Sequence, residues 1–382
     1  MPRKTTIRDI ARLAGVSTAT ISRVLNQKPG VDAETRERVL RIVQEQGYVP
    51  SMTASSLAGG RSRLLGVLVP SLTWPLMPNI MQGMAEVVEQ TDYELVLYSI
   101  SHRTDRSAFI DRILAARLID GLIAAYPDGI ARAETAGDVD RHASHHLEAI
   151  YQQGFPVVIL DDQSLPGKTP WVGPDNRVGA YEAVRHLVRL GHRRIAHIQG
   201  PVQYQCSHDR YAGYRQALEQ AQIAVDPALV VQGDFTTPSG RDAAAYLLTL
   251  PDRPTAVFAA NDQMAYGVLA VAKERGLPLP EDLAVIGFDD TMLSANTLPA
   301  LTTVKQPFED MGKSAAELLL ALIDVPRMLG PSWQNLVAHL ARARGASGAD
   351  PMHVQLPTKL VIRQSCGTYL HARVDELAVP VD

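Results

Sequence analysis

Cysteine is scarce in this sequence, and other familiar features are missing altogether. Only two cysteines, Cys206 and Cys366, occur in 382 residues. That number cannot build a disulfide framework and is typical of a reducing compartment. No run of about 18 apolar residues is present, so no membrane-spanning helix is expected. The opening MPRKTTIRDIARLAG has no apolar signal-peptide core. These absences argue against a secreted or membrane-spanning protein and predict a cytoplasmic one.

The length of the chain and its uneven charge indicate several domains. A chain of 382 residues exceeds one ordinary hydrophobic core, so two or three domains are expected. Residues 1–63 hold eleven Lys or Arg against five Asp or Glu, whereas the remaining residues hold 26 against 36. A basic N-terminal part on an acidic body indicates that the first part binds a polyanion. A chance imbalance of charge is the alternative.

The basic N-terminal part begins with the signals of a short helix and a tight turn. Thr6 and Asp9 form a capping-box pattern, which predicts that a helix starts near Ile7. Apolar residues then recur at helical spacing. Gly15 ends this helix, because glycine readily takes the left-handed conformation that the turn requires.

Two further helices are expected after this turn. Ser17 caps the second, and DAETRERVLRIVQEQG, from Asp32 to Gly47, fits the third. Two short helices joined by a glycine turn and braced by a third form a helix-turn-helix motif. The residues expected to point inward from the second and third helices are Ile21, Val24, Leu25, Val39, Leu40 and Val43.

The second helix is expected to present small polar side chains to a DNA major groove. Small side chains let the helix backbone approach the bases, and an arginine reaches guanine or phosphate. Asn26 and Thr35 are expected to contact phosphates. A three-helix packing module without a DNA role is the alternative, but such a module does not need an exposed polar helix. The outward residues are Thr18, Ala19, Thr20, Ser22 and Arg23.

The stretch TIRDIARLAGVSTATISRVLN, followed by GYVPSMTASSLAGG, resembles the N-terminal part of the lactose-repressor (LacI/GalR) family of bacterial transcription regulators. The resemblance implies a hinge over residues 50–63 that becomes helical on DNA, with Leu57 as a minor-groove wedge. An apolar wedge can unstack a base step and bend the duplex. Ser51 and Ser55 depart from the usual Asn and Arg of that family. The expected DNA-binding residues are Thr6, Ser17, Thr18, Ala19, Thr20, Ser22, Arg23, Asn26, Thr35, Tyr48, Leu57 and Ala58.

The larger part of the chain, residues 64–367, alternates short apolar runs with helical patterns. The runs expected to be buried parallel strands are LLGVLVP, YELVLYS, IDGLIAA, PVVILD, RRIAHIQG, TAVFAAND and LAVIGFDD. PNIMQGMAEVVEQ and GAYEAVRHLVRLG are expected helices between them. This alternation predicts an α/β fold of open parallel sheets covered by helices, arranged as two lobes.

Polar residues after the predicted strands mark a crevice between the lobes, where ligands of such folds bind. These motifs extend the family resemblance from about residue 5 to 367, and the family shares its two-lobed body with periplasmic sugar-binding proteins. Strand-end capping is the alternative for Asp175 and Asp289, and core packing is the alternative for Phe235. Trp74, in SLTWPLMPN, either stacks on the ligand or plugs the first lobe. The expected effector-binding residues are Trp74, Asp175, Arg210, Phe235, Asn261 and Asp289.

Three other features of the sequence carry weaker signals. RHASHHLE spaces His142, His145 and His146 as a metal site would, but an exposed polar helix fits better, and no metal or cofactor is expected. CSHD places Cys206 beside a histidine, although a catalytic pair is defined in space rather than in sequence. Two segments, about 128–148 and 326–353, read as surface insertions.

Together these observations predict a homodimeric repressor that binds a near-palindromic DNA operator under the control of a small molecule. A sugar is the expected effector, and a nucleoside or nucleobase is the alternative. Protein two-fold symmetry would match the symmetry of the operator. A solute-binding protein would need a secretion signal, and an enzyme would need a nucleophile and base in the crevice. The expected domains are residues 1–49, the hinge 50–63, the two-lobed part 64–367 and a tail 368–382.

Overall fold

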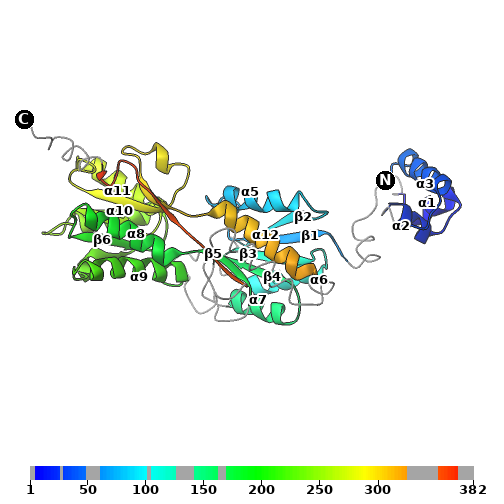
Figure 1. Ribbon diagram of the computed structural model, residues 1–382, viewed down its shortest axis with the longest axis horizontal. Helices are drawn as coiled ribbons and strands as arrows, with labels where there is room; N and C mark the ends of the chain where they lie inside the picture. The colour runs from blue at the N-terminus through cyan, green and yellow to red at the C-terminus, as the bar shows by residue number, and fades with distance from the viewer. Residues whose placement is uncertain are drawn as a thin grey trace, which may run out of the picture. The chain divides into compact units, whose positions relative to one another are not determined.

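The computed structural model divides the chain into two compact units, which we describe separately (Figure 1). Met1–Leu64 forms the first unit together with Asp111–Asp120, and the remaining residues form the second. We call residues 5–48 the head and the second unit the body. The residues that the structure describes are 5–25, 29–48, 61–100, 105–125, 142–161, 169–324 and 352–368.

The head contains the three predicted helices, α1 (Ile7–Ala14), α2 (Thr18–Leu25) and α3 (Ala33–Glu45). The predicted capping box is present, because Thr6 N–H donates to Asp9 Oδ2 over 3.0 Å while the Thr6 hydroxyl accepts from Asp9 N–H. Gly15 has φ 67° and ends α1 in the left-handed conformation. Local signals therefore located the helix-turn-helix correctly.

One inward residue of α3 was predicted wrongly. Val39 is fully buried and Val43 packs against the head core, but Leu40 is 48% exposed. Consecutive residues of a helix are about 100° apart, so Leu40 points away from the direction that Val39 faces. The residues that make up the buried core of the head are Ile10, Ala11, Ala14, Ile21, Val24 and Val39.

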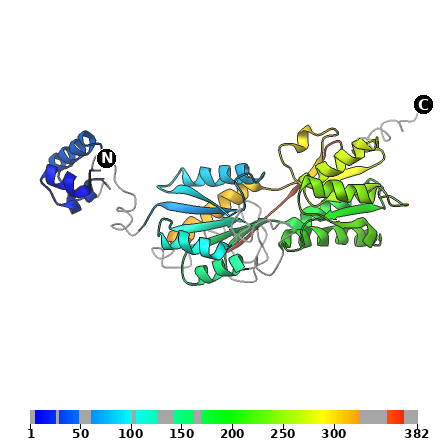
Figure 2. The same cartoon turned by 180° about the vertical axis from the view of Figure 1, so that it is seen from behind.

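The first lobe of the body is a six-stranded sheet in the order β11-β5-β4-β3-β1-β2. Figures 1 and 2 view it from opposite sides, and α12 lies in front of the sheet in the first view and behind it in the second. Its strands are β1 (Leu64–Val69), β2 (Glu94–Ser99), β3 (Gly121–Ala125), β4 (Val157–Leu160), β5 (Trp171–Pro174) and β11 (His353–Leu356). Its helices are α5 (Met77–Val88), α6 (Arg106–Ala115), α7 (His142–Gln152) and α12 (Phe308–Asp324).

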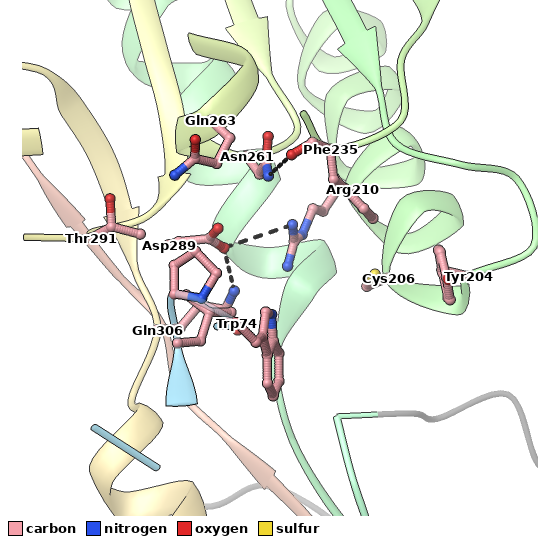
Figure 3. A pocket seen from close by; sticks show the side chains of 12 residues that line it. Trp74, Tyr204, Cys206, Arg210, Phe235, Asn261, Gln263, Asp289, Thr291 and Gln306 are labelled. Carbon is pink, nitrogen blue, oxygen red and sulfur yellow. Dashed lines mark hydrogen bonds and ion pairs between the residues drawn. The ribbon is translucent and has the colours of Figure 1, made fainter. Parts of the chain in front are cut away.

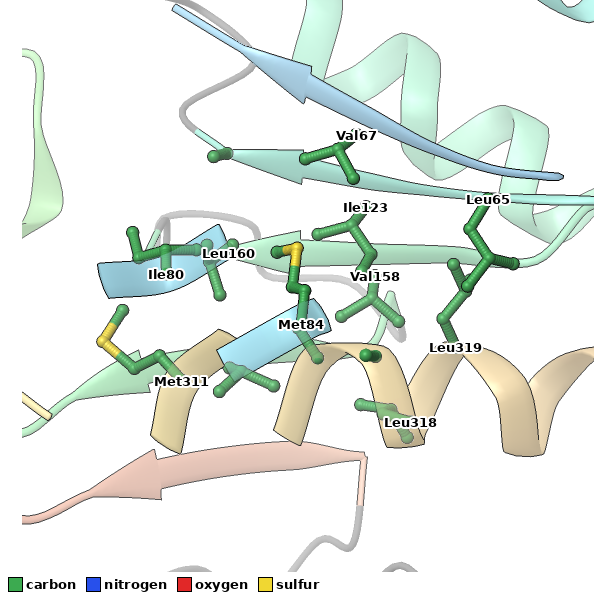
Figure 4. Close-up of a cluster of buried hydrophobic side chains, with 14 of the residues drawn as sticks. Leu65, Val67, Ile80, Met84, Ile123, Val158, Leu160, Met311, Leu318 and Leu319 are labelled. Atoms are coloured by element: carbon green, nitrogen blue, oxygen red, sulfur yellow. The ribbon is translucent and has the colours of Figure 1, made fainter. Parts of the chain in front are cut away.

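Apolar side chains from α5 and α12 fill one face of this sheet (Figure 4). Leu65, Val67 and Ile123 point from the strands toward Met84 and Leu319 of the helices, and all five are fully buried. Burying such side chains contributes roughly 1.5–3 kcal/mol each relative to leaving them in water. This core fixes the position of the segments that lead into α5 and α12.

The second lobe is a six-stranded sheet in the order β12-β10-β9-β8-β6-β7, with β12 antiparallel to β10. Two helix pairs enclose separate apolar clusters against it. Its strands are β6 (Ile195–Gln199), β7 (Val230–Gln232), β8 (Ala256–Ala259), β9 (Ala284–Asp289), β10 (Thr302–Lys305) and β12 (Lys359–Val361). Its helices are α8 (Asn176–Arg189), α9 (Gln205–Gln220), α10 (Thr237–Leu247) and α11 (Asp262–Glu274), with short 3-10 turns at Pro227–Leu229 and Ser294–Asn296.

All seven predicted strands are present, and the two-lobed α/β fold is confirmed. The structure adds strands that the apolar runs did not reveal. β5 contains glycine and proline, which are depleted in strands, and β7 is only three residues long. The predicted insertion near 128–148 overlaps α7 from His142 onward. Its earlier residues and most of 326–353 lie outside the described residues.

Within the described residues, the chain passes between the two sheets after β5, after β10 and after β11. The passage after β5 and the passage after β11 are joined by hydrogen bonds. Asp175 N–H donates to Leu356 O over 2.8 Å, and the Thr358 hydroxyl donates to Asp175 O over 3.2 Å. The second passage starts at Gln306, so the residues around these passages can respond to movement of either lobe.

Candidate functional site

The outward face of α2 is the first candidate site. Thr18, Ala19 and Arg23 are exposed, while Thr20 and Ser22 are half-buried. The Thr20 hydroxyl lies 2.9 Å from Ser17 Oγ, which also accepts from the Thr20 backbone N–H over 3.1 Å. The predicted polar face therefore exists, although it is narrower than the sequence suggested.

The other predicted DNA contacts lie around this helix. Thr6 is exposed at the start of α1. Thr35 lies in the first turn of α3, where its backbone N–H donates to Asp32 Oδ1 over 2.8 Å. Tyr48 packs against the head core. The remaining predicted contacts fall outside the described residues: Asn26, Leu57 and Ala58.

The second candidate site is a pocket in the body (Figure 3). Trp74 and its neighbours come from the first lobe, and most of the polar residues follow strands of the second lobe. The lining residues are Trp74, Pro75, Leu76, Tyr204, Cys206, Arg210, Phe235, Asn261, Gln263, Asp289, Thr291 and Gln306.

Arg210 is the central cation of the pocket and is only 3% exposed. Its Nε donates to Asn176 Oδ1 over 2.9 Å, and one terminal nitrogen donates to Ala260 O over 2.6 Å. Its guanidinium also lies 3.9 Å from the centre of the Phe288 ring, close enough for a cation–π contact. These contacts hold the guanidinium plane in one orientation before any ligand binds.

Asp289 faces Arg210 and is also buried. Its Oδ1 lies 3.9 Å from an Arg210 terminal nitrogen and accepts a 2.7 Å hydrogen bond from Gln306 Nε2. Burial raises the pKa of Asp289 well above its ordinary value, although Arg210 acts in the opposite direction. The Gln306 Oε1 atom is buried and has no hydrogen-bond partner among the described residues.

Phe235 and Asn261 are joined by a hydrogen bond at the pocket wall. Asn261 Nδ2 donates to Phe235 O over 3.0 Å, and Asn261 Oδ1 caps α11. Phe235 has φ 68°, and its ring lies 6.1 Å from that of Tyr204. A Cβ atom at Gly200 would lie 2.3 Å from the Phe235 ring, so glycine makes room for the ring. Phe235 therefore lines the pocket and also packs against an apolar core cluster of the second lobe.

Trp74 forms the apolar wall of the pocket. It is 8% exposed and belongs to the core cluster of the first lobe, yet it also lines the pocket beside Pro75 and Leu76. The two alternatives drawn from the sequence, a ligand platform and a plug of the lobe, are therefore not exclusive. An aromatic face at this position is available to a ring.

Asp175 lies elsewhere. It does not line the described pocket, and its side chain accepts from Val178 N–H over 3.0 Å as the N-cap of α8. This is the strand-end capping alternative. Asp175 adjoins Asn176, which holds Arg210, so it lies one residue away from a group that contacts the pocket cation.

Several lining residues were not identified from the sequence. Gln306, Gln263 and Thr291 each follow shortly after a strand end or lie at the start of a helix, in the same setting as the residues that were identified. Gln306 follows the apolar run of the stretch ALTTVKQPF, so a polar side chain at this position was a usable signal. Tyr204 lies in the loop before α9, where no periodicity points to it.

Behind the pocket, Asp262 organises the loop that carries Thr291. It accepts from Thr291 N–H over 2.9 Å and from the hydroxyls of Ser294 and Thr303, each over 2.5 Å. Burial raises the pKa of Asp262 to about 6, against these hydrogen bonds. The polar wall of the pocket is thus backed by a second set of buried hydrogen bonds.

The CSHD stretch lies at the start of α9 and reaches the pocket through Cys206. Cys206 lines the pocket, but His208 Nε2 lies 2.6 Å from Val202 O, and Asp209 accepts from Gln205. Among the described residues, no group of three or more His, Cys, Asp or Glu side chains is placed to hold a metal ion.

Comparison with known proteins identifies the architecture. The sequence matches the family of bacterial regulatory proteins of the lacI type over residues 6–51 and the periplasmic binding protein-like domain over residues 184–366. It is 33% identical over 315 residues to catabolite control protein A of Priestia megaterium, covering 82% of this chain and 91% of that protein. The chain belongs to the LacI family.

Two solved structures of transcriptional regulators are similar to this chain over most of its length. The lac repressor dimer bound to operator and the anti-inducer ONPF has a TM-score of 0.76 at 30% identity, covering 95% of this chain and 99% of that one. The complex of the transcriptional regulator CelR with cellobiose has a TM-score of 0.65 at 30% identity, covering 95% and 100%.

Membership of the LacI family confirms the predicted class of function. The chain is a DNA-binding transcriptional regulator, with a helix-turn-helix head and a periplasmic-binding-protein-like body. A regulator of this family works in the cytoplasm, where bacterial DNA lies. Within the described residues, every helix is too short or too polar to cross a membrane.

Proposed function

We propose that this LacI-family regulator is a homodimeric repressor whose grip on a near-palindromic operator is controlled by a sugar bound in the body pocket. We divide the chain into a DNA-binding head (1–49), a hinge (50–63), an effector-binding and dimerisation part (64–367) and a tail (368–382). Two heads related by two-fold symmetry would read two half-sites. The lac repressor structure, a dimer on its operator, supports this arrangement by analogy.

The proposed readers of sequence are the outward residues of α2. Arg23 is exposed at the end of α2, so its guanidinium can reach base edges or phosphates. Thr18 and Ala19 are small, which lets the helix backbone lie close to the bases. The proposed supporting contacts are Thr6, Ser17, Thr20, Ser22, Asn26, Thr35 and Tyr48, with Leu57 and Ala58 as the minor-groove wedge.

The pocket is the proposed effector site, and one juxtaposition supports a sugar above all. The polar side chains of Asp289 and Gln306 and the aromatic rings of Trp74 and Phe235 line the same pocket. Sugars combine hydroxyl donors with apolar ring faces, so they match both kinds of group. The proposed contacts are Trp74, Arg210, Phe235, Asn261, Gln306 and Asp289, whereas Asp175 acts on α8 as a cap.

The charge of the pocket favours a neutral effector. Arg210 faces Asp289 and also donates to Asn176 and to a backbone carbonyl, so its charge is already balanced inside the protein. The CelR structure, described as a cellobiose complex, offers a sugar precedent in the same architecture. A nucleoside or nucleobase is the second candidate, because the Trp74 and Phe235 rings would also stack on a base.

The effector would control DNA binding if the two lobes take different relative positions with and without it. The ligand would contact Trp74 of the first lobe and Arg210 and Asp289 of the second, so it binds best to one arrangement. A ligand shifts an equilibrium only by its difference in affinity for the two states, typically about 1–3 kcal/mol. The chain would act without chemical conversion of the effector, because the neighbours of Cys206 bond to other groups.

The test uses the full-length protein. Symmetric duplexes are first selected from a random library, and a panel of mono- and disaccharides, nucleosides and nucleobases is then screened by thermal shift and by release of the selected duplex. We expect a neutral sugar to raise the melting temperature, because it binds the folded state, and to change DNA affinity. Chemical conversion of the bound ligand would establish an enzyme instead, and failure to select any symmetric duplex would overturn the repressor.

A further inference from the structure

The last residues of the hinge are held in place by the carboxylate of one residue, Asp120, which belongs to the same compact unit. Asp120 Oδ1 accepts from the Ser62 backbone N–H over 2.7 Å and from the Ser62 hydroxyl over 2.9 Å. Asp120 Oδ2 accepts from Arg63 N–H over 3.0 Å. The backbone of Asp120 donates in turn to Leu64 O over 2.8 Å. Four hydrogen bonds thus hold three consecutive residues against one aspartate.

The backbone at this point has an uncommon conformation. Arg63 has φ 61°, in the left-handed region that residues with a Cβ atom seldom occupy. Such conformations persist where surrounding contacts over-determine them, and they occur often at switch regions. The Asp120 carboxylate supplies that contact, because it receives the Arg63 N–H directly.

This fastening extends the pairing of two central strands beyond their ends. β1 starts at Leu64, and Leu65 pairs with Gly121 in β3. Asp120 is the residue immediately before β3, and its backbone bond to Leu64 O continues the strand pairing by one residue, while its carboxylate holds Ser62 and Arg63. Residues 111–120 also belong to the same compact unit as Met1–Leu64 rather than to the body.

The covalent path from the head to the pocket runs through this segment. A ligand in the body alters DNA binding only if the two states of the body differ in how they present the head. If the segment after residue 60 were not held by such contacts, the hinge could leave the body in many orientations. The two states of the body would then differ less in how they present the head. A joint fixed by four hydrogen bonds passes the position of β1 and β3 on to the hinge.

We propose that Asp120 is a positioning residue for DNA recognition, whose carboxylate anchors the body end of the hinge. The proposal rests on the proposed function, since it assumes that specific DNA binding depends on how the body presents the hinge. A purely structural role, in which Asp120 only completes the edge of β1, predicts a change in stability and nothing else. The two roles differ in measurable ways.

The first measurement is limited proteolysis of the full-length protein. Trypsin cleaves after Arg61 and Arg63, which flank the anchored Ser62. We expect Asp120→Ala to raise cleavage at these two sites by about tenfold, because local opening governs proteolysis of a folded chain. The matched control is Asp105→Ala, which removes a 2.8 Å carboxylate bond to Ala108 N–H at the start of α6. The control should leave cleavage after Arg61 and Arg63 unchanged.

The second measurement is DNA binding by fluorescence anisotropy. The probes are a symmetric duplex selected by the wild-type protein and a scrambled duplex of the same length. We expect Asp120→Ala to weaken the selected duplex about tenfold and the scrambled duplex less than twofold, since scrambled DNA is held mainly by phosphate contacts of the head. Asp105→Ala should leave the ratio of the two affinities unchanged.

The outcomes separate the two proposals. If the wild-type protein selects no symmetric duplex, the proposed function fails. If it selects one and Asp120→Ala keeps the same affinity ratio, Asp120 is only structural and the inference fails. Should Asp120→Ala not fold, Asp120→Asn takes its place: it keeps an acceptor for Ser62 but loses the acceptor for Arg63 N–H, and it should give a smaller loss of the same kind.

Discussion

The outward face of α2 and the polar wall of the pocket both present polar side chains, but they are built differently. On α2, Thr18 and Arg23 are exposed. In the pocket, Arg210 and Asp289 are 3% and 6% exposed, and protein groups such as Gln306 already bind them. The outward side chains of α2 therefore take little part in the packing of the protein, whereas the polar side chains of the pocket wall are part of its core. Substitutions should therefore separate binding from stability on α2 and combine them in the pocket.

The largest effect is expected from Arg210→Ala. Removing this side chain leaves Asp289 buried without its cation and Asn176 without its donor, so the body should lose about 3–5 kcal/mol of unfolding free energy. The response to effector should be abolished, while binding to the selected duplex persists at temperatures below unfolding. Urea unfolding and anisotropy measure the two effects.

Asp289→Ala is the companion of this variant, because it removes the other charge of the pair. It should also abolish the effector response. Survival of that response in both variants would show that the effector binds elsewhere. Undiminished stability of Arg210→Ala would contradict the view that the pocket wall belongs to the core.

The second prediction concerns pH and the core behind the pocket. His197 is fully buried and stacks on Tyr214 and Phe258 with ring centres 5.0 Å apart. Its Nδ1–H donates to Phe258 O over 3.0 Å, and its Nε2 has no hydrogen-bond partner among the described residues. Burial lowers its pKa from 6.5 to about 4. The unfolded chain therefore takes up a proton below pH 6.5 that the folded chain does not, and the contribution of His197 to stability falls by about 3 kcal/mol as the pH drops from 6.5 to 4.

His197→Phe should remove this acid sensitivity and retain the stacking. Asp262 acts in the opposite direction, because its raised pKa of about 6 lets the folded state take up a proton before the unfolded state does. The pH dependence of the wild-type protein alone is therefore shallow. The informative quantity is the difference in unfolding free energy between variant and wild type, which should shift by about 3 kcal/mol in favour of the variant between pH 7 and 4. A difference that stays constant over this range would show that His197 titrates normally.

The third prediction returns to the exposed surface. Arg23→Ala should weaken binding to the selected duplex by about 1–3 kcal/mol and binding to a scrambled duplex far less, if the guanidinium reads a base edge. Because Arg23 is exposed, thermal stability should not change. Equal losses on both duplexes would show that Arg23 contacts only phosphate.

Local signals in the sequence predicted the features that depend on neighbouring residues. The Thr6–Asp9 capping box, the turn at Gly15 and the buried run at Val157–Leu160 all lie within a few residues of the signals that announce them. The placement of Gln306 beside Asp289 depends on two strands that meet only in the folded sheet. No periodicity in either segment contains that information.

Two positions show why the sequence leaves the direction of a side chain open. Asp175 follows a strand just as Asp289 does, yet the first caps a helix and the second faces the pocket cation. Leu40 is as apolar as its neighbours in α3, but helical rotation turns it outward. Residue type and spacing show that a side chain lies near a strand end or on a helix, and the tertiary contacts decide which way it points.

The smallest effect on stability is expected at Leu40 of α3, which the sequence analysis placed in the core of the head. Val39 and Leu40 are adjacent, but Val39 is fully buried in the head core and Leu40 is 48% exposed. Val39→Ala should therefore cost about 2 kcal/mol, because it leaves a cavity, whereas Leu40→Ala should cost less than about 0.5 kcal/mol. Melting of the head, followed by circular dichroism, measures both. Equal losses of stability in the two variants would mean that another part of the folded protein covers Leu40. The surface of the head would then not be as exposed as its contrast with the buried pocket wall requires.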